Sequence, residues 1–141
     1  MTPANSATTA LVAAYYVHFN AANWPEMLDL LTEDVIHDIN QGEREIGIPA
    51  FRTFLARMDR CYKERLTHIH VMASSDGRHA AAEYVVEGTY KATDDGLPPA
   101  TGQTYRIAGG AFFDIRDGRI ARVSNAYNLN EWLRQISSSA A

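Results

Sequence analysis

The spacing of apolar residues changes once along the chain, near Glu64, and this change restricts the fold more than any other feature. Before it, apolar residues recur at intervals of three and four, which is typical of amphipathic helices. After it, β-branched and aromatic residues alternate with polar ones, which is typical of strands. A run of helices followed by a run of strands predicts an α+β domain with its helices on one face of an antiparallel sheet.

The first half of the chain should contain three helices and one short strand. The apolar spacing predicts helices over residues 10–22, from residue 24 to about residue 32, and from residue 47 to about residue 62. Residues 35–40 form the predicted strand, and residues 41–45 form the turn after it.

The second half should contain four antiparallel strands and a short closing helix. The predicted strands span residues 66–74, 79–93, 104–116 and 119–129, and the helix spans residues 131–136. Strands of this length cannot stay flat at normal twist, so Gly88, Gly109 and Gly110 are predicted bend points. The concave side of such a sheet becomes the floor of a pocket.

The composition fits one globular domain of 141 residues, with 46% hydrophobic and 21% charged side chains; we assign residues 1–141 to it, with a core over about residues 11–136. A net charge of −4 and scattered Lys and Arg residues argue against a nucleic-acid partner or an anionic membrane. A single cysteine, Cys61, excludes an internal disulfide, and no apolar run reaches the roughly 18 residues that span a bilayer. A cytoplasmic location is the default expectation.

Several short segments carry a family resemblance over about residues 11–136. They are residues 15–21, 31–38, 117–120 and 127–129, together with Gly47, nine positions past Asp38. In this order and spacing, the chain resembles the SnoaL-like and ketosteroid isomerase-like family of the NTF2-like superfamily, and is similar to proteins described as steroid delta-isomerase-related. The resemblance implies a cone of helices on a strongly curved antiparallel sheet that encloses a pocket, and a homodimer formed through the sheet.

The resemblance also implies a catalytic site. The base of the family falls on Asp38, and its oxyanion-binding tyrosine falls on Tyr15, or on Tyr16 if the helix register slips. A second oxyanion donor, an aspartic acid in the family, falls on Ala111, so this donor is missing. Because losing such a donor lowers a rate on the order of 100-fold to 1,000-fold, we expect poor turnover of 3-oxo-Δ5-steroids and higher activity in Ala111→Asp.

Further residues are candidates for contact with the substrate. Alternation places Asn125 and Tyr127 on one side of their strand, and Tyr84 and Tyr90 on a common face suited to stacking a flat apolar ligand. The substrate-binding candidates are Tyr16, His37, Tyr84, Tyr90, Ala111, Phe113, Asn125 and Tyr127. No metal site is predicted, because the histidine pair in the sequence His68-Ile69-His70 has no third ligand at a matching spacing.

These residues predict an enzyme of the isomerase or cyclase type, without a cofactor, that moves a proton next to a carbonyl of a small hydrophobic molecule. Asp38 would be the base, and Tyr15 with Asn125 or Tyr127 would polarise the oxygen. A non-catalytic module that binds a hydrophobic ligand or mediates dimerisation is the alternative. A hydrolase or dehydratase that activates water with Asp38 and His37 is a third possibility, but alternation turns these side chains apart unless a bulge intervenes.

Overall fold

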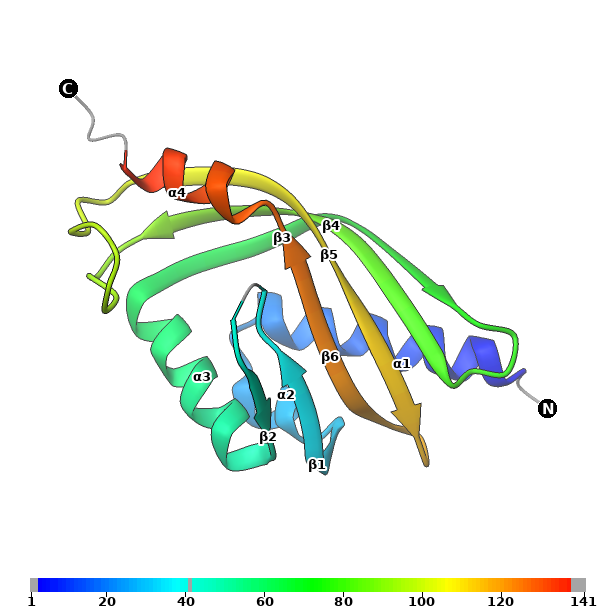
Figure 1. The fold of residues 1–141 in the computed structure, drawn as a ribbon. Coiled ribbons are helices and arrows are strands. Elements are labelled where there is room, and N and C mark those ends of the chain that lie inside the picture. The colour runs from blue at the N-terminus through cyan, green and yellow to red at the C-terminus, as the bar shows by residue number, and fades with distance from the viewer. Residues whose placement is uncertain (1–2, 41, 138–141) are drawn as a thin grey trace.

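Helices fill the first part of the chain and long strands the second, as the periodicity predicts (Figure 1). The computed structural model describes residues 3–40 and 42–137, so residues 1–2 and 138–141 of the predicted domain, and Gln41 of the predicted turn, lie outside the described residues. Within these ranges, four helices pack on a six-stranded sheet. The predicted α+β architecture is confirmed.

The helices form where the apolar spacing is helical. They are α1 (Ala4–Asn20), α2 (Trp24–Leu28), α3 (Ile48–Cys61) and α4 (Leu129–Ser137). Helix α3 begins after Gly47, whose φ of 98° favours glycine, and Pro49 lies in its first turn, where a backbone N–H is not needed. Helix α2 is shorter than predicted because the chain enters a strand at Leu31. No helix in the described part of the chain is long and apolar enough to cross a membrane.

The six strands form one mixed sheet. They are β1 (Leu31–Asp38), β2 (Arg44–Ile46), β3 (Tyr62–Ala73), β4 (His79–Tyr90), β5 (Thr104–Arg116) and β6 (Arg119–Tyr127). Their order across the sheet is β2-β1-β6-β5-β4-β3. The prediction of a wholly antiparallel sheet is wrong at one pair, because β1 and β6 run parallel. Strand β2 overlaps the predicted turn over residues 41–45. The strand was not predicted, because three residues are too few to reveal alternation.

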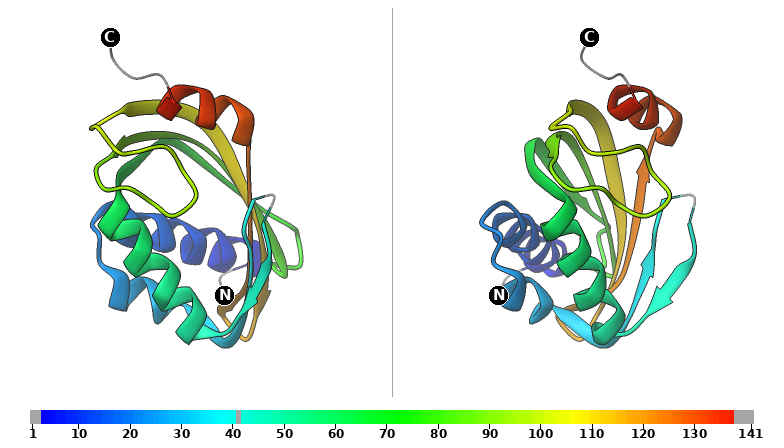
Figure 2. Two further views of the ribbon diagram at one scale, coloured as in Figure 1. Left: turned by 60° about the vertical axis from the view of Figure 1, so that its left-hand side comes forward. Right: turned by 90° about the vertical axis from the view of Figure 1, so that its left-hand side faces the viewer.

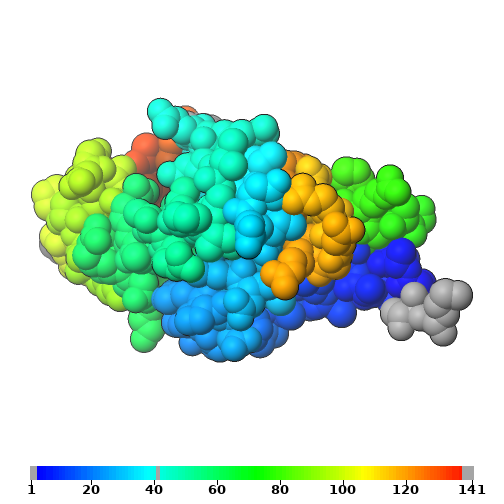
Figure 3. Space-filling model, turned by 90° about the horizontal axis from the view of Figure 1, so that it is seen from below, coloured from blue at the N-terminus to red at the C-terminus, as the bar shows by residue number. Residues whose placement is uncertain are grey.

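The long strands β3, β4 and β5 bend over the helices, so that α1 and α3 lie on the concave side of the sheet and α4 lies across one end (Figure 2). Seen from below, α2 and α3 cover the molecule beside β1 (Figure 3). A Cβ atom at Gly88 would lie 2.3 Å from Cζ of Tyr105, and one at Gly110 would lie 2.9 Å from the carbonyl oxygen of Ala82. Two of the three predicted bend points therefore lie where a side chain would collide with a neighbouring strand.

Two apolar clusters hold the helices on the sheet. The larger lies between the first three helices and the concave face, and it contains Val12 and Phe51, neither of which is more than 1% exposed. The smaller surrounds Trp132 of α4, whose ring contacts the rings of Tyr62 and Tyr105. Burying one such side chain stabilises a fold by about 1.5–3 kcal/mol. Side chains from both clusters line one cavity.

Candidate active site

The cavity has a volume of about 330 Å³ and lies between the concave face of the sheet and helices α1, α3 and α4. Its size is that of a small-molecule site. Aromatic rings form much of its wall, namely Tyr15, Tyr16, Phe19, Phe51, Phe54, Tyr62, Tyr84, Tyr105, Tyr127 and Trp132. A flat apolar molecule could stack on such walls, and the polar groups described next could orient it.

His37 of β1 lies in the wall of this cavity. It pairs with Val123 of β6, which is buried on the concave face. Only 2% of His37 is exposed. The imidazole ring packs against Phe51 and Phe54, with centroid distances of 4.5 and 4.6 Å. Its Nε2 atom lies 3.2 Å from the amide nitrogen of Asn125. Its Nδ1 atom has no hydrogen-bond partner among the described residues.

The surroundings of His37 keep its ring neutral. Burial lowers the pKa of His37 to about 4, although the negative charge of Asp38 acts in the opposite direction. As placed, the Asn125 amide nitrogen donates to Nε2, so the ring proton resides on Nδ1; the amide turned by 180° would accept from Nε2–H and leave the lone pair on Nδ1. A neutral imidazole in an apolar wall can accept a proton from a bound molecule.

Asp38 lies on the other face of the sheet. It pairs with Ser124, and Ser124 pairs with Phe112, which is 54% exposed on the convex side. Its carboxylate accepts hydrogen bonds of 2.6 and 3.1 Å from Arg44 and lies 3.7 Å from Arg122. The Arg44 hydrogen bond lowers the pKa of this carboxyl.

The prediction that Asp38 is a base inside the pocket beside Tyr15 must therefore be corrected. Asp38 does not line the cavity, whereas His37, its neighbour in the chain, does. The reason is the strand register, which buries Val35 and His37 and turns the residue after each of them outward. The same register removes the arrangement that a hydrolase with His37 and Asp38 on one side would need.

Both tyrosines proposed from helix α1 reach the cavity. The rings of Tyr15 and Tyr16 are buried and meet edge to face at a centroid distance of 5.2 Å. Burial raises the pKa of both phenols far above their usual range, so they remain protonated hydrogen-bond donors at neutral pH. Helix α1 thus presents both tyrosines to the same cavity.

The other predicted contact residues divide into two groups. Tyr84, Asn125 and Tyr127 line the cavity, whereas Tyr90, Ala111 and Phe113 do not. The Tyr90 hydroxyl is occupied at the end of β4, where it donates to Pro98 O and accepts from Asp94 N.

Ala111 and Phe113 are shielded from the cavity by the packing of helix α1. Phe113 is fully buried beneath the rings of Tyr15 and Tyr16, at centroid distances of 5.8 and 6.1 Å. Ala111 is 1% exposed in the same cluster. The prediction of these residues as substrate contacts is corrected, because the helix covers this part of the concave face.

Two further polar clusters in the wall contain residues that were not among the predicted candidates. The hydroxyl of Tyr62 donates to Asp94 at 2.7 Å, and Arg57 lies 3.4 Å from the same carboxylate. The hydroxyl of Tyr105 donates to Glu64 at 2.5 Å. Alternation did not reveal Glu64, because the predicted strand begins at residue 66, whereas β3 begins at Tyr62 and turns Tyr62 and Glu64 the same way.

No group of three potential metal ligands converges within the described ranges. The polar side chains that line the cavity supply an imidazole, carboxyls, a guanidinium, phenols and amides. These groups can hold and move protons on a molecule surrounded by aromatic rings.

The SnoaL-like domain family matches residues 12–123 of the chain. A candidate polyketide cyclase from Pseudomonas putida is 57% identical, with a TM-score of 0.92 over 92% of this chain and 98% of its own. Another from Xanthomonas campestris pv. campestris is 55% identical, with a TM-score of 0.93 over 95% of this chain and 99% of its own. No curated protein matches.

A more distant structure is similar in fold alone. An NTF2-like protein from Burkholderia xenovorans is 11% identical, with a TM-score of 0.75 over 94% of this chain and 98% of its own. The predicted NTF2-like fold, with helices packed on a strongly curved sheet, is confirmed.

Proposed function

Because the chain belongs to the SnoaL-like domain family, we propose that it is a cofactor-independent enzyme of the isomerase or cyclase type, which moves a proton next to a carbonyl of a small hydrophobic substrate. One observation carries the proposal: His37 lies in the wall of an aromatic cavity, neutral and with its Nδ1 atom unpartnered among the described residues. His37 takes the role of base that the family resemblance assigns to Asp38.

The proposed step begins with the imidazole of His37. Its free lone pair takes a proton from the carbon next to the carbonyl, and the electrons of the C–H bond move toward the carbonyl oxygen. This step uses the Asn125 amide turned by 180° from its placement in the structure, so that its oxygen accepts from Nε2–H and the lone pair lies on Nδ1. A phenol hydroxyl, with Tyr15 as the first candidate, donates to the oxygen that gains charge.

The lining of the cavity indicates an uncharged substrate. Its carboxyl groups are those of Glu64, Asp94 and Asp95, and its guanidinium is that of Arg57, so acidic groups outnumber basic ones. An anion would meet repulsion here, whereas a neutral ketone would meet aromatic walls and hydrogen-bond donors. A ketone with a second carbonyl would allow the same enolate to close a ring, which is the reaction that the word cyclase denotes in the two close relatives.

The test is hydrogen exchange on a model ketone. 2-Tetralone is incubated with the protein in D₂O, and proton NMR follows deuterium incorporation next to the carbonyl. We expect exchange well above the buffer rate, a loss of about 100-fold in His37→Gln, and little change in the matched control Asp38→Asn. Equal exchange in wild type and His37→Gln would reject His37 as the base. Binding of 2-tetralone without any exchange would favour the non-catalytic binding module.

A further inference from the structure

Glu64, Gly88 and Tyr105 form one row across three neighbouring strands. Glu64 of β3 pairs with Gly88 of β4, which in turn pairs with Tyr105 of β5. Glu64 and Tyr105 both line the cavity. Gly88, which has no side chain, lies between them.

Gly88 allows Tyr105 to reach Glu64. A Cβ atom at position 88 would lie 2.3 Å from Cζ and 2.5 Å from the hydroxyl oxygen of Tyr105, so the phenol ring crosses the sheet over the glycine. Its hydroxyl donates to Oε2 of Glu64 at 2.5 Å. Trp132 of α4 packs edge-on against the ring at a centroid distance of 5.9 Å. The phenol is thereby held in place, with one carboxyl oxygen occupied.

Glu64 differs from Asp38 and Asp94 in having no ion pair. Asp38 is paired with Arg44, and Asp94 lies beside Arg57. Within the described ranges, no Lys, Arg or His lies within salt-bridge distance of Glu64. The hydroxyls of Tyr84, Tyr105 and Tyr127 are near enough that a negative charge on Glu64 raises their pKa values. Burial raises the pKa of the Glu64 carboxyl itself, although the Tyr105 hydrogen bond opposes this.

We propose that Glu64, positioned by Tyr105 across Gly88, is a second catalytic residue of the cavity and donates a proton to the substrate oxygen. This inference rests on the proposed function, in which His37 acts at the carbon. Tyr105 occupies Oε2, so the proton on Oε1 is directed at the ketone.

The proton transfers balance over one cycle. His37 takes a proton from carbon and becomes imidazolium, while the carboxyl of Glu64 gives its proton to the carbonyl oxygen and becomes carboxylate. The product of this half-reaction is a neutral enol. In the return half, imidazolium protonates a carbon of the enol, and the enol O–H returns its proton to the carboxylate. Both side chains regain their starting forms, and no oxidant or cofactor is consumed.

The first experiment does not depend on turnover. Protein labelled with ¹³C at glutamate side-chain carboxyls is titrated by NMR, and the Glu64 resonance is assigned from its absence in Glu64→Gln. We expect it to titrate above the ordinary glutamate value, higher still in Tyr105→Phe, and to shift when 2-tetralone is added. The proposal is overturned if the Glu64 resonance titrates at the ordinary glutamate value and does not shift when 2-tetralone is added.

The second experiment repeats the deuterium exchange on 2-tetralone with Glu64→Gln and Gly88→Ala. We expect a loss of about 100-fold in Glu64→Gln and a smaller loss in Gly88→Ala, which displaces the Tyr105 ring. The matched control is Glu87→Gln, an exposed carboxylate on the opposite face of β4, which should retain full exchange. If His37→Gln loses exchange and Glu64→Gln does not, the acid role fails while the proposed function stands. If wild type gives no exchange, the proposed function fails, and the ketone-induced NMR shift alone decides whether Glu64 meets the ligand.

Discussion

His37 and Asp38 are consecutive residues of β1 whose side chains lie on opposite faces of the sheet. The imidazole is buried against Phe51 on the concave side, and the carboxylate is held by Arg44 on the convex side. A single residue of register thus separates a group that can meet a ligand from one that meets solvent and arginines. A substitution at Asp38 can therefore serve as the control for a substitution at His37.

Asp38→Asn should therefore lower stability slightly and leave exchange on 2-tetralone intact. The substitution removes a partly exposed ion pair with Arg44 and a weaker one with Arg122. Pairs of this kind contribute up to about 1 kcal/mol. Thermal unfolding followed by circular dichroism measures the change in stability. Loss of exchange together with an unchanged melting temperature would restore Asp38 as the base.

The folded protein should lose stability in acid through His37. Its pKa is about 4 in the folded state against an ordinary value of 6.5, so between these values only the unfolded chain binds the proton. This contribution is fully present above pH 6.5 and disappears as the pH falls toward 4, for a total of about 3 kcal/mol.

Urea unfolding at several pH values measures this contribution as the difference in slope between wild type and His37→Gln. The other histidines are present in both proteins, so their effect cancels. Parallel curves for the two proteins would show that His37 titrates normally in the folded state.

Much of the fold could be predicted from the sequence, because the burial of α3 and of the long strands leaves a clear period. The bounds of β5, residues 104–116, agree with the prediction to the residue. The parallel pairing of β1 with β6 could not be predicted, since it joins Leu31 to Ile120 and no turn connects the two strands directly. Register between such strands depends on tertiary packing.

The site could be predicted only in part, for a reason visible in β1. Val35 and Ile36 are both apolar, so alternation is satisfied with either His37 or Asp38 facing inward. The pairing of β1 with β6 is also irregular between Leu31 and Ile36, which local sequence does not reveal. The family resemblance favours Asp38, whereas packing against α3 buries His37.

Ala111→Asp should lower the stability of the protein rather than improve catalysis. The residue is 1% exposed inside the core and does not line the cavity, so the new carboxylate would be desolvated. Burying an unpaired charge costs about 3 kcal/mol or more. The matched control is Ala108→Asp, the same change at an exposed position of the same strand, which should cost less than about 1 kcal/mol. Urea denaturation compares the two; increased exchange activity in a stable Ala111→Asp protein would contradict the expectation.

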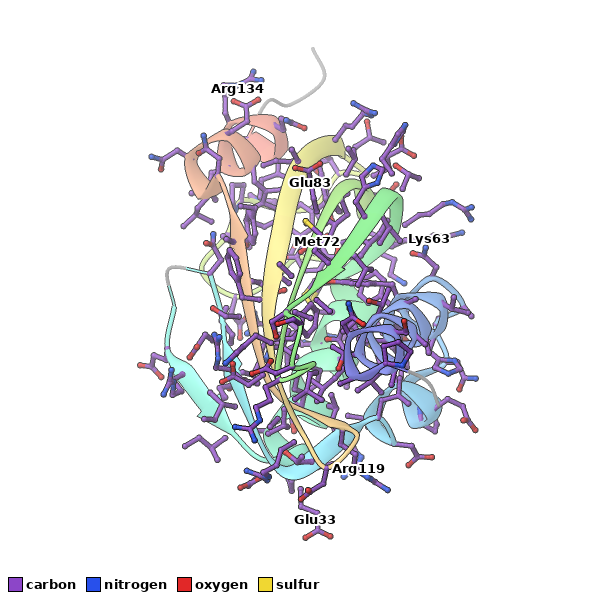
Figure 4. The ribbon with its side chains drawn as sticks, turned by 90° about the vertical axis from the view of Figure 1, so that its right-hand side faces the viewer. Glu33, Lys63, Met72, Glu83, Arg119 and Arg134 are labelled. Carbon is purple, nitrogen blue, oxygen red and sulfur yellow. The ribbon has the colours of Figure 1, made fainter. Side chains whose placement is uncertain are left out.

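The convex face should form a homodimer. Met72 of β3, labelled in Figure 4, pairs with Ala81, which pairs with Phe112; Met72 and Phe112 are each 54% exposed. Exposed apolar side chains in one row favour contact with a second copy. Light scattering should give twice the 15.7 kDa chain mass for wild type and a single chain mass for Phe112→Glu. A one-chain mass for wild type at micromolar concentration would exclude the dimer.

The contact between Gly88 and Tyr105 restricts the order in which these positions can change during evolution. A side chain acquired first at position 88 would strike the ring, and Tyr105→Phe gives no relief because the nearest atom is Cζ, which phenylalanine retains. The ring must therefore leave its present place when the glycine is replaced. Descendants that keep an aromatic residue at 105 should inherit glycine at 88, even where the carboxyl at 64 has been exchanged for another group.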